Sequence, residues 1–431
     1  MVLMDRQARL LPDGVRRTKL WRGPSFVLAL CLLGTSAPAA TKLSLEQALS
    51  LAEDYHPLLR VGIARIEGAQ AGITTSRAYP MPQFGVIAGQ QTFRVPGNVS
   101  GLSQFFTLSQ PLELGPLRPA RQQVAQLNRQ SNEHLLAGTR INVLSSVRRA
   151  FYQVLRRRSE IDVLTENLRL VEELRKRIQV RVEVGEAGRL ELVRADAELI
   201  AARSAANSAR LQYISSLTLL RTSVGSTLDP DLIIEGQLDP FVALPPLDTL
   251  RQEALDTHPG MAYLRSEIRR SEANVAYEIA QRRPQPQLVA EIERPPDSPS
   301  YRVGFSIPLN FWNRREGPIA EAAAMVRQVG AQAQNRELEF VSGLESSYAR
   351  YNLATQQLAA FEQGLFVEAA EAVRAAEVAY RLGERGILEV LDAQRVLRTV
   401  RLDFLNAQYD RQAALIDLDE LRARDLRRNI P

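Results

Sequence analysis

The side chains that could do chemistry in this chain are few and widely spaced. Glu389 and Asp392 lie three residues apart in a stretch with helical periodicity, so their carboxylates share one helix face. Such a pair can bind cations, but the spacing alone favours a solvated acidic face. His56, His134 and His258 are scattered along the chain and lack the spacing of metal ligands. We therefore predict no metal site and no cofactor.

The sequence also lacks the common catalytic motifs. It contains no phosphate-binding glycine loop, no nucleophile elbow and no HExxH motif. Its only cysteine, Cys31, falls in a segment that we expect to be removed, which leaves no thiol for catalysis, disulfides or metal binding. An enzyme is not predicted.

The N-terminus has the three parts of a secretory signal. A basic region ends at Arg22, an apolar stretch runs from Phe26 to Leu33, and small residues at 37–39 suit cleavage before Ala40. Acylation of Cys31 as a lipoprotein is a weaker alternative, because bulky Leu30 stands where a small residue is expected. We predict a signal peptide over residues 1–39.

The basic character of the chain lies mostly in this leader. Residues 1–39 hold six basic and two acidic side chains, so the remainder, with 48 basic and 47 acidic residues, is nearly neutral. A nucleic-acid partner is therefore not expected, since its binding needs a basic face that survives processing. The remainder also has no run of about 20 apolar residues, so no transmembrane helix is predicted.

An internal repeat organises the rest of the chain. Four short motifs occur twice in the same order, at offsets of 202, 204, 197 and 198 residues. They are His56-Pro57 and His258-Pro259, PMPQ at 80–83 and PQPQ at 284–287, QPL at 110–112 and IPL at 307–309, and VGEAG at 184–188 and LGERG at 382–386. This steady period predicts a first structural repeat over residues 40–235 and a second of the same layout over 236–431.

Each copy is predicted to contain a helix, two strands and a long helical hairpin. In the first copy the helix spans residues 45–77 and ends before Pro80 and Pro82. Strands follow at about 83–95 and 99–110, with a turn at 96–98. In the second copy apolar and polar residues alternate from Tyr301 to Leu309. This alternation suits a strand with lipid on one side and water on the other.

The hairpin helices are unusually long. A helix is predicted over residues 118–183, because no proline follows Pro119 in this stretch. At ~1.5 Å per residue such a helix would reach on the order of 100 Å. Its hairpin partner, 189–222, is half as long. The other half of the long helix would be covered by the first helix of the next copy, 247–282, which follows a linker at 229–246. The second hairpin is predicted at 319–382 and 387–424. Apolar residues three or four apart indicate coiled-coil packing: Ile161, Leu164, Leu168, Val171, Leu174 and Ile178.

Four strands per chain are too few to close a membrane barrel, since the smallest natural ones have about eight. Strand edges would have to pair with other copies of the chain. We expect a mainly α-helical protein with a small β part. Its coiled-coil hairpins would form a tunnel, and its four strands would join a trimeric, 12-stranded transmembrane β-barrel. The alternative is a periplasmic coiled-coil adaptor or scaffold protein, which leaves the duplicated strand pairs unexplained.

Several longer segments resemble the TolC family of outer-membrane efflux proteins, and several look closest to its CzcC-like heavy-metal efflux branch. They are QPLELGPLRPAR at 110–121, IPLNFWNRREGPIAEA at 307–322 and LGERGILEVLDAQR at 382–395, together with both His-Pro helices. The resemblance covers the mature chain. It implies a homotrimeric exit duct in the outer membrane of a Gram-negative bacterium, with the helical part in the periplasm. The implied partners are a periplasmic adaptor protein and an inner-membrane pump of the resistance-nodulation-division type, with heavy-metal cations as the cargo of that branch.

The resemblance also implies where the working residues lie. The turns between the hairpin helices would form the periplasmic tips that dock the adaptor: Val184, Gly185, Glu186, Ala187, Gly188, Leu382, Gly383, Glu384 and Gly386. Their glycines suit turns that need positive φ. Glu389 and Asp392 match a pair of acidic residues that ring the family's aperture. Arg385 matches a residue that ties the second hairpin to the first, and Glu191 is its expected partner. These four residues are the predicted periplasmic gate.

Overall fold

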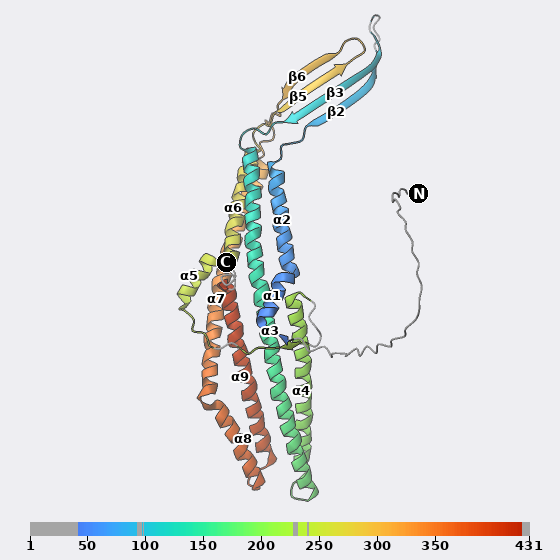
Figure 1. The fold of residues 1–431 in the computed structure, drawn as a ribbon. Coiled ribbons are helices and arrows are strands. Elements are labelled where there is room, and N and C mark those ends of the chain that lie inside the picture. The colour runs from blue at the N-terminus through green and yellow to red at the C-terminus, as the bar shows by residue number, and fades with distance from the viewer. Residues whose placement is uncertain (1–41, 93–96, 98, 227–231, 239–240, 425–431) are drawn as a thin grey trace, which may run out of the picture. The chain divides into compact units, whose positions relative to one another are not determined.

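The computed structural model describes residues 42–92, 97, 99–226, 232–238 and 241–424, so the predicted signal peptide lies outside the described residues. Helices and strands follow one another in the same order in both halves of the chain (Figure 1). The first half contains α1 (Leu45–Tyr55), α2 (Pro57–Arg77), β2 (Gln83–Gln91), β3 (Gly101–Pro111), α3 (Leu117–Glu183) and α4 (Arg189–Val224). The second contains α5 (Leu247–Thr257), α6 (Pro259–Ala280), β5 (Gln287–Arg294), β6 (Ser300–Ser306), α7 (Glu316–Ala360), a π-helix (Phe361–Leu365), α8 (Phe366–Arg381) and α9 (Ile387–Leu421). Two short strands, β1 (Lys42–Leu43) and β4 (Ile233–Ile234), pair in parallel.

The first helix of each copy is broken at its histidine. His56 separates α1 from α2 and His258 separates α5 from α6, each in an extended conformation. Each ring caps the helix that follows, because its Nδ1 accepts a backbone N–H two residues further on, at 3.2 Å for His56 and 3.0 Å for His258. The following proline occupies the first helical position, where it needs no hydrogen-bond donor. The prediction of one continuous helix over 45–77, and of another over 247–282, was therefore wrong, because each consists of two helices.

The four long strands form one antiparallel sheet in the order β2-β3-β5-β6. The strand pairs of both copies are thus joined through β3 and β5, while β2 and β6 lie at the edges. The strands are shorter than predicted: β2 ends at Gln91, β3 begins at Gly101, and β6 ends at Ser306, before the proline that follows Ile307. Proline cannot donate a ladder hydrogen bond, which accounts for the early end of β6.

The two faces of this sheet differ in polarity. The register places Val86 opposite Phe106, Phe106 opposite Ile292, and Ile292 opposite Tyr301, so these side chains share one face. The same face carries Phe84, Ala88, Leu108, Leu288, Ala290, Val303 and Phe305. The neighbouring rows on the other face are mostly small or polar, and there Arg302 forms an ion pair with Glu293.

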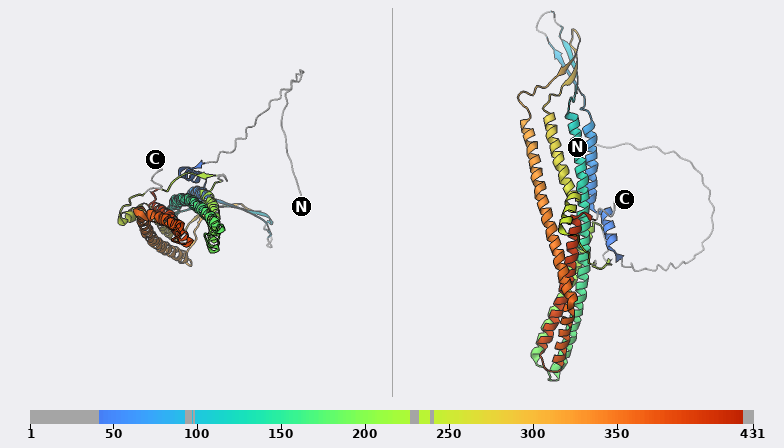
Figure 2. Two further views of the ribbon diagram at one scale, coloured as in Figure 1. Left: turned by 90° about the horizontal axis from the view of Figure 1, so that it is seen from below. Right: turned by 90° about the vertical axis from the view of Figure 1, so that its left-hand side faces the viewer.

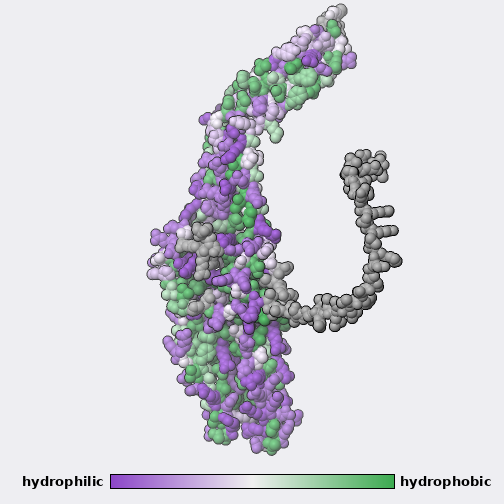
Figure 3. All heavy atoms as spheres, in the orientation of Figure 1, coloured by the Kyte–Doolittle hydropathy of each residue, from purple (hydrophilic) through white to green (hydrophobic). Residues whose placement is uncertain are grey.

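The apolar face of the sheet is open. Tyr301 is 69% exposed and Val303 is 77% exposed. Hydrophobic residues gather on the sheet in Figure 3, whereas hydrophilic residues are prominent along the helices. A continuous exposed apolar sheet face in one chain marks a surface that lipid or another protein covers.

The helix α3 is the axis on which the other helices pack. It is 67 residues long and unbroken, as the sequence predicts, and at ~1.5 Å per residue it spans on the order of 100 Å. Helices α2, α4, α6 and α9 pack against it, with α2 and α6 beside its sheet-proximal half and α4 beside its distal half (Figures 1 and 2). The predicted coiled-coil stripe is confirmed, since Leu164, Val171, Leu174 and Ile178 are buried.

The corresponding helix of the second copy is interrupted. The prediction of one helix over 319–382 was wrong, because α7 ends at Ala360 and α8 begins at Phe366. Between them Gly364 has φ +128°, outside the range of a helix. Only glycine adopts that conformation without strain. The rings of Phe361, Phe366 and, from α9, Phe404 pack together at this break, with centroids 4.9–5.7 Å apart. Phe404 meets the other two rings edge to face.

The middle of the helical region holds the largest core. Phe151 and Tyr152 of α3 pack with residues of α1, α4, β4 and α9. A buried ion pair, Arg148 to Asp419 at 3.1 Å, ties α3 to the end of α9. In the described part of the chain, no helix is both long enough and apolar enough to cross a membrane.

Candidate functional site

Both helical hairpins end in the same tight turn, as their shared motif predicts. Gly185 follows α3 with φ +81°, and Gly383 follows α8 with φ +75°. In each turn the next amide N–H donates back to a carbonyl of the preceding helix, at 2.8 Å from Glu186 and 2.9 Å from Glu384. A residue with a Cβ would strain these two positions, so glycine here is a requirement of the turn.

The other two glycines of the motif have a different role. Gly188 has φ −79° and Gly386 has φ −82°, and each is the N-cap of the helix that follows. The prediction of positive φ was wrong for both, because an N-cap residue takes an extended conformation that any residue can adopt.

The turn residues are accessible. Val184 is 64% exposed and Leu382 is 68% exposed. Glu186 and Glu384 are exposed beside them, and Ala187 is half-buried. Each tip thus presents an apolar side chain next to a carboxylate. We call these two turns, residues 184–188 and 382–386, the tips.

A hydrogen bond joins the two hairpins just behind the tips. The hydroxyl of Tyr380 on α8 donates to the carboxylate of Glu191 on α4 at 2.9 Å. The guanidinium of Arg181 on α3 lies 4.7 Å from the centre of the Tyr380 ring. Burial, followed by the bond to Glu191, raises the pKa of Tyr380, so the phenol stays a donor at neutral pH. Beneath this contact lies a small core made of Leu174, Ile178, Ala195, Tyr380, Ile387, Val390 and Leu391.

The predicted Arg385–Glu191 pair is not present within one chain. Glu191 accepts from Tyr380 instead, and among the described residues Arg385 makes no ion pair within 4.0 Å. Arg385 lies beyond the Gly383 turn and is exposed, whereas Tyr380 lies before the turn and faces α4. Tyr380 and Arg181 were missed from the sequence. The signal for Tyr380 was its position in the last turn of α8, on the face that packs against the first hairpin.

The two predicted gate carboxylates share an open face of α9. Glu389 and Asp392 are both exposed, while Val390 and Leu391 between them are buried. Asp392 lies 3.4 Å from Arg395 in the next turn. Arg395 in turn contacts Glu198 of α4 at 2.6 Å. The negative charge of Asp392 is therefore partly compensated. Among the described residues, Glu389 has no ion pair within 4.0 Å.

Glu198 is a second link between the hairpins that the sequence did not reveal. It is 6% exposed and lies on α4 against α9. Its carboxylate contacts two guanidinium groups, Arg395 at 2.6 Å and Arg398 at 3.3 Å. A buried carboxylate is stable only with such partners, so this contact fixes where α9 lies along α4.

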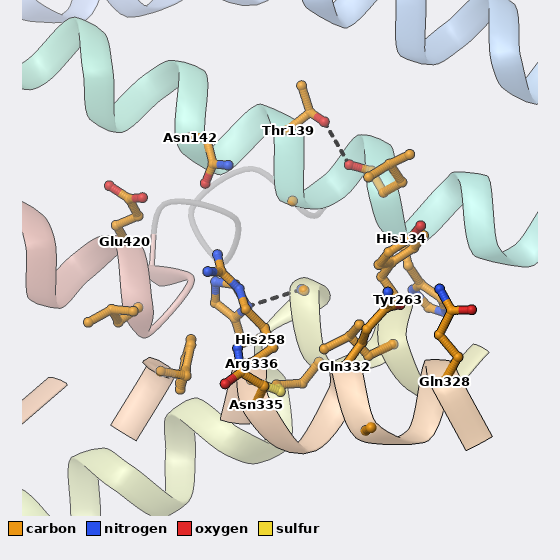
Figure 4. A pocket seen from close by; sticks show the side chains of 18 residues that line it. His134, Thr139, Asn142, His258, Tyr263, Gln328, Gln332, Asn335, Arg336 and Glu420 are labelled. Carbon is orange, nitrogen blue, oxygen red and sulfur yellow. Dashed lines mark hydrogen bonds between the residues drawn. The ribbon is translucent and has the colours of Figure 1, made fainter. Parts of the chain in front are cut away.

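A cavity lies nearer the sheet, where the end of α9 meets the start of α6 (Figure 4). It has a volume of about 760 Å³ and is walled by α3, α6, α7 and the end of α9. His134 and His258, far apart in sequence, both line it. Burial, and then the charge of Arg336, lowers the pKa of His258 to about 4, so this ring is neutral. No cluster of three metal-ligating side chains occurs in the part of the chain that the structure describes.

This architecture defines a class of protein. The sequence profile described as "Outer membrane efflux protein" matches residues 48–226 and again 250–423, and the chain belongs to that family. It is thus an outer-membrane efflux protein, which decides against the scaffold alternative.

Two curated relatives match along most of their length. The chain is 25% identical over 418 residues to the cobalt-zinc-cadmium resistance protein CzcC of Cupriavidus metallidurans, covering 93% of this chain and 96% of the relative. It is also 25% identical over 345 residues to the nickel-cobalt-cadmium resistance protein NccC of Alcaligenes xylosoxydans xylosoxydans, covering 78% and 76%.

Solved structures share the fold at lower identity. The outer-membrane channel OprN aligns with a TM-score of 0.77 at 16% identity, covering 88% of this chain and 89% of that one. The outer membrane protein VceC of Vibrio cholerae aligns with a TM-score of 0.73 at 17% identity, covering 88% and 95%. These similarities confirm the predicted fold class.

Proposed function

We propose that this protein is the outer-membrane exit duct of a tripartite efflux system and moves solutes by passive conduction. The observation that carries the proposal is the two-faced sheet. Its apolar face suits the lipid of the outer membrane, and its polar face suits a water-filled lumen. The helices behind the sheet are long enough, at about 100 Å, to extend far into the periplasm.

The proposed assembly is a homotrimer. Edge strands β2 and β6 would pair with neighbouring copies, so three chains would close a 12-stranded barrel without free edges. Two structural repeats over residues 40–235 and 236–431, preceded by a signal peptide over 1–39, complete the proposed organisation.

The tips would meet the periplasmic adaptor protein, which connects the duct to an inner-membrane pump of the resistance-nodulation-division type. Exposed Val184 and Leu382 support this role, because apolar side chains at the end of a polar helical hairpin favour contact with a partner. The glutamates beside them would set its orientation.

The proposed gate lies immediately behind the tips. Glu389 and Asp392 of three chains would place six carboxylates around the aperture, which would attract cations and let a tightly bound cation block the pore. Tyr380 and Glu191 would hold the hairpins together in the closed state. Arg385, exposed at the turn, would add positive charge at the rim.

Heavy-metal cations are the proposed cargo. The names of the two curated relatives associate them with resistance to cobalt, cadmium, zinc and nickel.

The first test is the mass of the mature protein extracted from outer membranes, measured by light scattering with the detergent contribution subtracted. We expect a trimer that needs detergent for extraction and gives discrete conductance steps in a planar bilayer. A monomer, or a protein released by salt alone, would contradict the proposal.

A further inference from the structure

A second cavity lies between the hairpins, between the gate and the π-helix. Its volume is about 320 Å³, and its walls are α3 on one side and α8 and α9 on the other. Helices α3 and α8 both pack on α9, and the cavity occupies the space that remains between them. A water molecule takes a share of about 30 Å³ in the liquid, so this cavity has room for a larger ligand.

Two buried amide side chains line this cavity, and each has one atom without a hydrogen-bond partner in the described part of the chain. Asn167 of α3 and Gln394 of α9 are each only 8% exposed. Among the described residues, nothing bonds to Nδ2 of Asn167 or to Oε1 of Gln394. Buried polar atoms are nearly always paired, so a pair of orphans in one cavity indicates a ligand that supplies the missing bonds.

The charged groups of the cavity are mostly positive. Arg374, Arg398 and Arg401 line it, against a single carboxylate, Glu377. Arg374 is only 3.9 Å from its nearest acidic neighbour, at the limit of an ion pair. Arg398 shares Glu198 with Arg395. Arg401 makes no ion pair within 4.0 Å in the part of the chain that the structure describes, and its charge acts at longer range on Glu166.

We propose that this cavity binds a small oxyanion of the phosphate type. Guanidinium groups match the geometry and charge of such an anion. The Nδ2 group of Asn167 would donate to one of its oxygens. A hydrogen phosphate also carries an O–H, which would donate to Oε1 of Gln394. The anion thus supplies both an acceptor and a donor, and both orphan atoms are satisfied.

The position of the site gives the anion a structural effect. It touches the first hairpin through α3 and the second through α8 and α9, so its binding stabilises the packed arrangement of the two. If the hairpins form the gate, an inference that rests on the proposed function, the bound anion favours the closed duct.

Binding is tested by isothermal titration of the detergent-solubilised trimer with inorganic phosphate, against sodium chloride of equal ionic strength. We expect saturable binding for phosphate and none for chloride. Arg401→Gln and Asn167→Leu should each weaken phosphate binding about tenfold or more, because each removes a direct donor. Asn167→Leu keeps the branched shape of the side chain and removes its donor, so this variant tests the site if Arg401→Gln does not fold. Arg336→Gln is the matched control, since Arg336 is an exposed helix arginine outside this cavity, and it should bind phosphate as the wild type does.

Absence of saturable phosphate binding to the wild-type trimer would overturn the proposal. So would equal phosphate affinity in the wild type and in folded Arg401→Gln and Asn167→Leu. Neither measurement depends on conduction, so failure of this site leaves the duct function separately testable. In a planar bilayer, phosphate should lower the open fraction of the wild type but not of Asn167→Leu.

Discussion

The hydroxyl of Tyr380 and the carboxylate of Glu191 lie 2.9 Å apart, and this bond joins the last turn of α8 to the first turn of α4. It connects the two hairpins close to the tips. Glu198 forms the next connection, two turns further along α4. Because both connections lie on the same side of α4, separating the second hairpin from the first requires breaking them in turn.

Replacing Tyr380 with phenylalanine should open the duct. Tyr380→Phe keeps the ring in its core and removes one hydrogen bond to a charged acceptor, worth about 1–2 kcal/mol. We expect a higher single-channel conductance or open fraction in a planar bilayer. Tyr213→Phe, on α4 far from the tips, is the control and should conduct as the wild type does. Equal conductance of the two variants would remove Tyr380 from the gate.

The charged rim residues should act together. The double variant Arg385→Ala with Glu389→Ala is expected to give a leakier channel in a planar bilayer. Unchanged conductance would contradict the assignment of these residues to the gate. Since Arg385 makes no ion pair with Glu191 within one chain, Arg385→Ala alone should have a smaller effect than Tyr380→Phe.

The gate carboxylates should determine block by cations. Glu389→Gln is expected to weaken the block of conductance by a divalent cation about tenfold, because it removes from each chain the carboxylate that has no ion-pair partner. Asp392→Asn should weaken it less, since Arg395 already compensates part of that charge. The measurement is the concentration of added cation that halves the current, and the order of the two effects is the decisive result.

His258 should make stability depend on pH. Its pKa is about 4 in the folded chain against an ordinary 6.5, so the unfolded chain binds the additional proton between these values. Stability is full above pH 6.5 and falls as the pH drops towards 4, by about 1–2 kcal/mol once partial exposure is allowed for. His258→Asn keeps the cap, because the amide oxygen can accept the backbone N–H of Gly260. In this variant the thermal midpoint should fall less between pH 6.5 and pH 4 than in the wild type.

The first copy supplies the control for this histidine. His56 occupies the same capping position but is less buried, and burial lowers its pKa as well. His56→Asn should therefore change the pH dependence in the same direction by a smaller amount. A larger change for His56→Asn than for His258→Asn would contradict burial as the cause.

Replacing Gly364 with alanine should destabilise the fold. Gly364→Ala meets no neighbouring atom within 4 Å, so its cost comes from the φ of +128° alone and is about 1–3 kcal/mol. Gly330→Ala, in the regular part of α7 and equally free of neighbours, should instead stabilise by about 0.5–1 kcal/mol. Thermal midpoints of the two variants should move in opposite directions.

The two faces of the sheet should respond differently to charge. Val303→Arg places a guanidinium on the apolar face and should cost about 2–4 kcal/mol if that face meets the middle of a bilayer. Thr107→Arg points to the other face, where Glu291 is its cross-strand neighbour, and should be tolerated. The yield of detergent-extracted trimer from outer membranes measures both. Equal yields of the two variants would contradict contact of the apolar face with lipid.

The sequence predicts most of the helices because long-range periodicity is strong in them. The predicted 118–183 differs by one residue at one end from the observed Leu117–Glu183, since proline and glycine mark both ends. The repeated motifs also predicted the strand pairs, although Gln91 and Ser306 end their strands earlier than alternation suggested. Strand ends depend on where the partner strand stops, which alternation does not encode.

The contacts between hairpins were less predictable. The Tyr380–Glu191 bond joins residues 189 positions apart, and nothing in the local pattern of either helix specifies that meeting. Glu198 reads as one of many surface glutamates until α9 is placed against α4. The break at Gly364 was missed because glycine within a helical pattern is usually tolerated, and only its φ reveals that the helix stops there.

The two halves of the chain differ in the continuity of their long helices although they share a layout. The long helix of the first half runs from the sheet to its tip without a break, whereas its counterpart is interrupted at Gly364 beside three aromatic rings that pack together. In a ring of three chains, rods and jointed arms would alternate around the lumen. The rods would keep the diameter of the outer wall constant while the arms swing about their joints. In the proposed trimer, the duplicated layout would thus provide both a fixed frame and a movable gate.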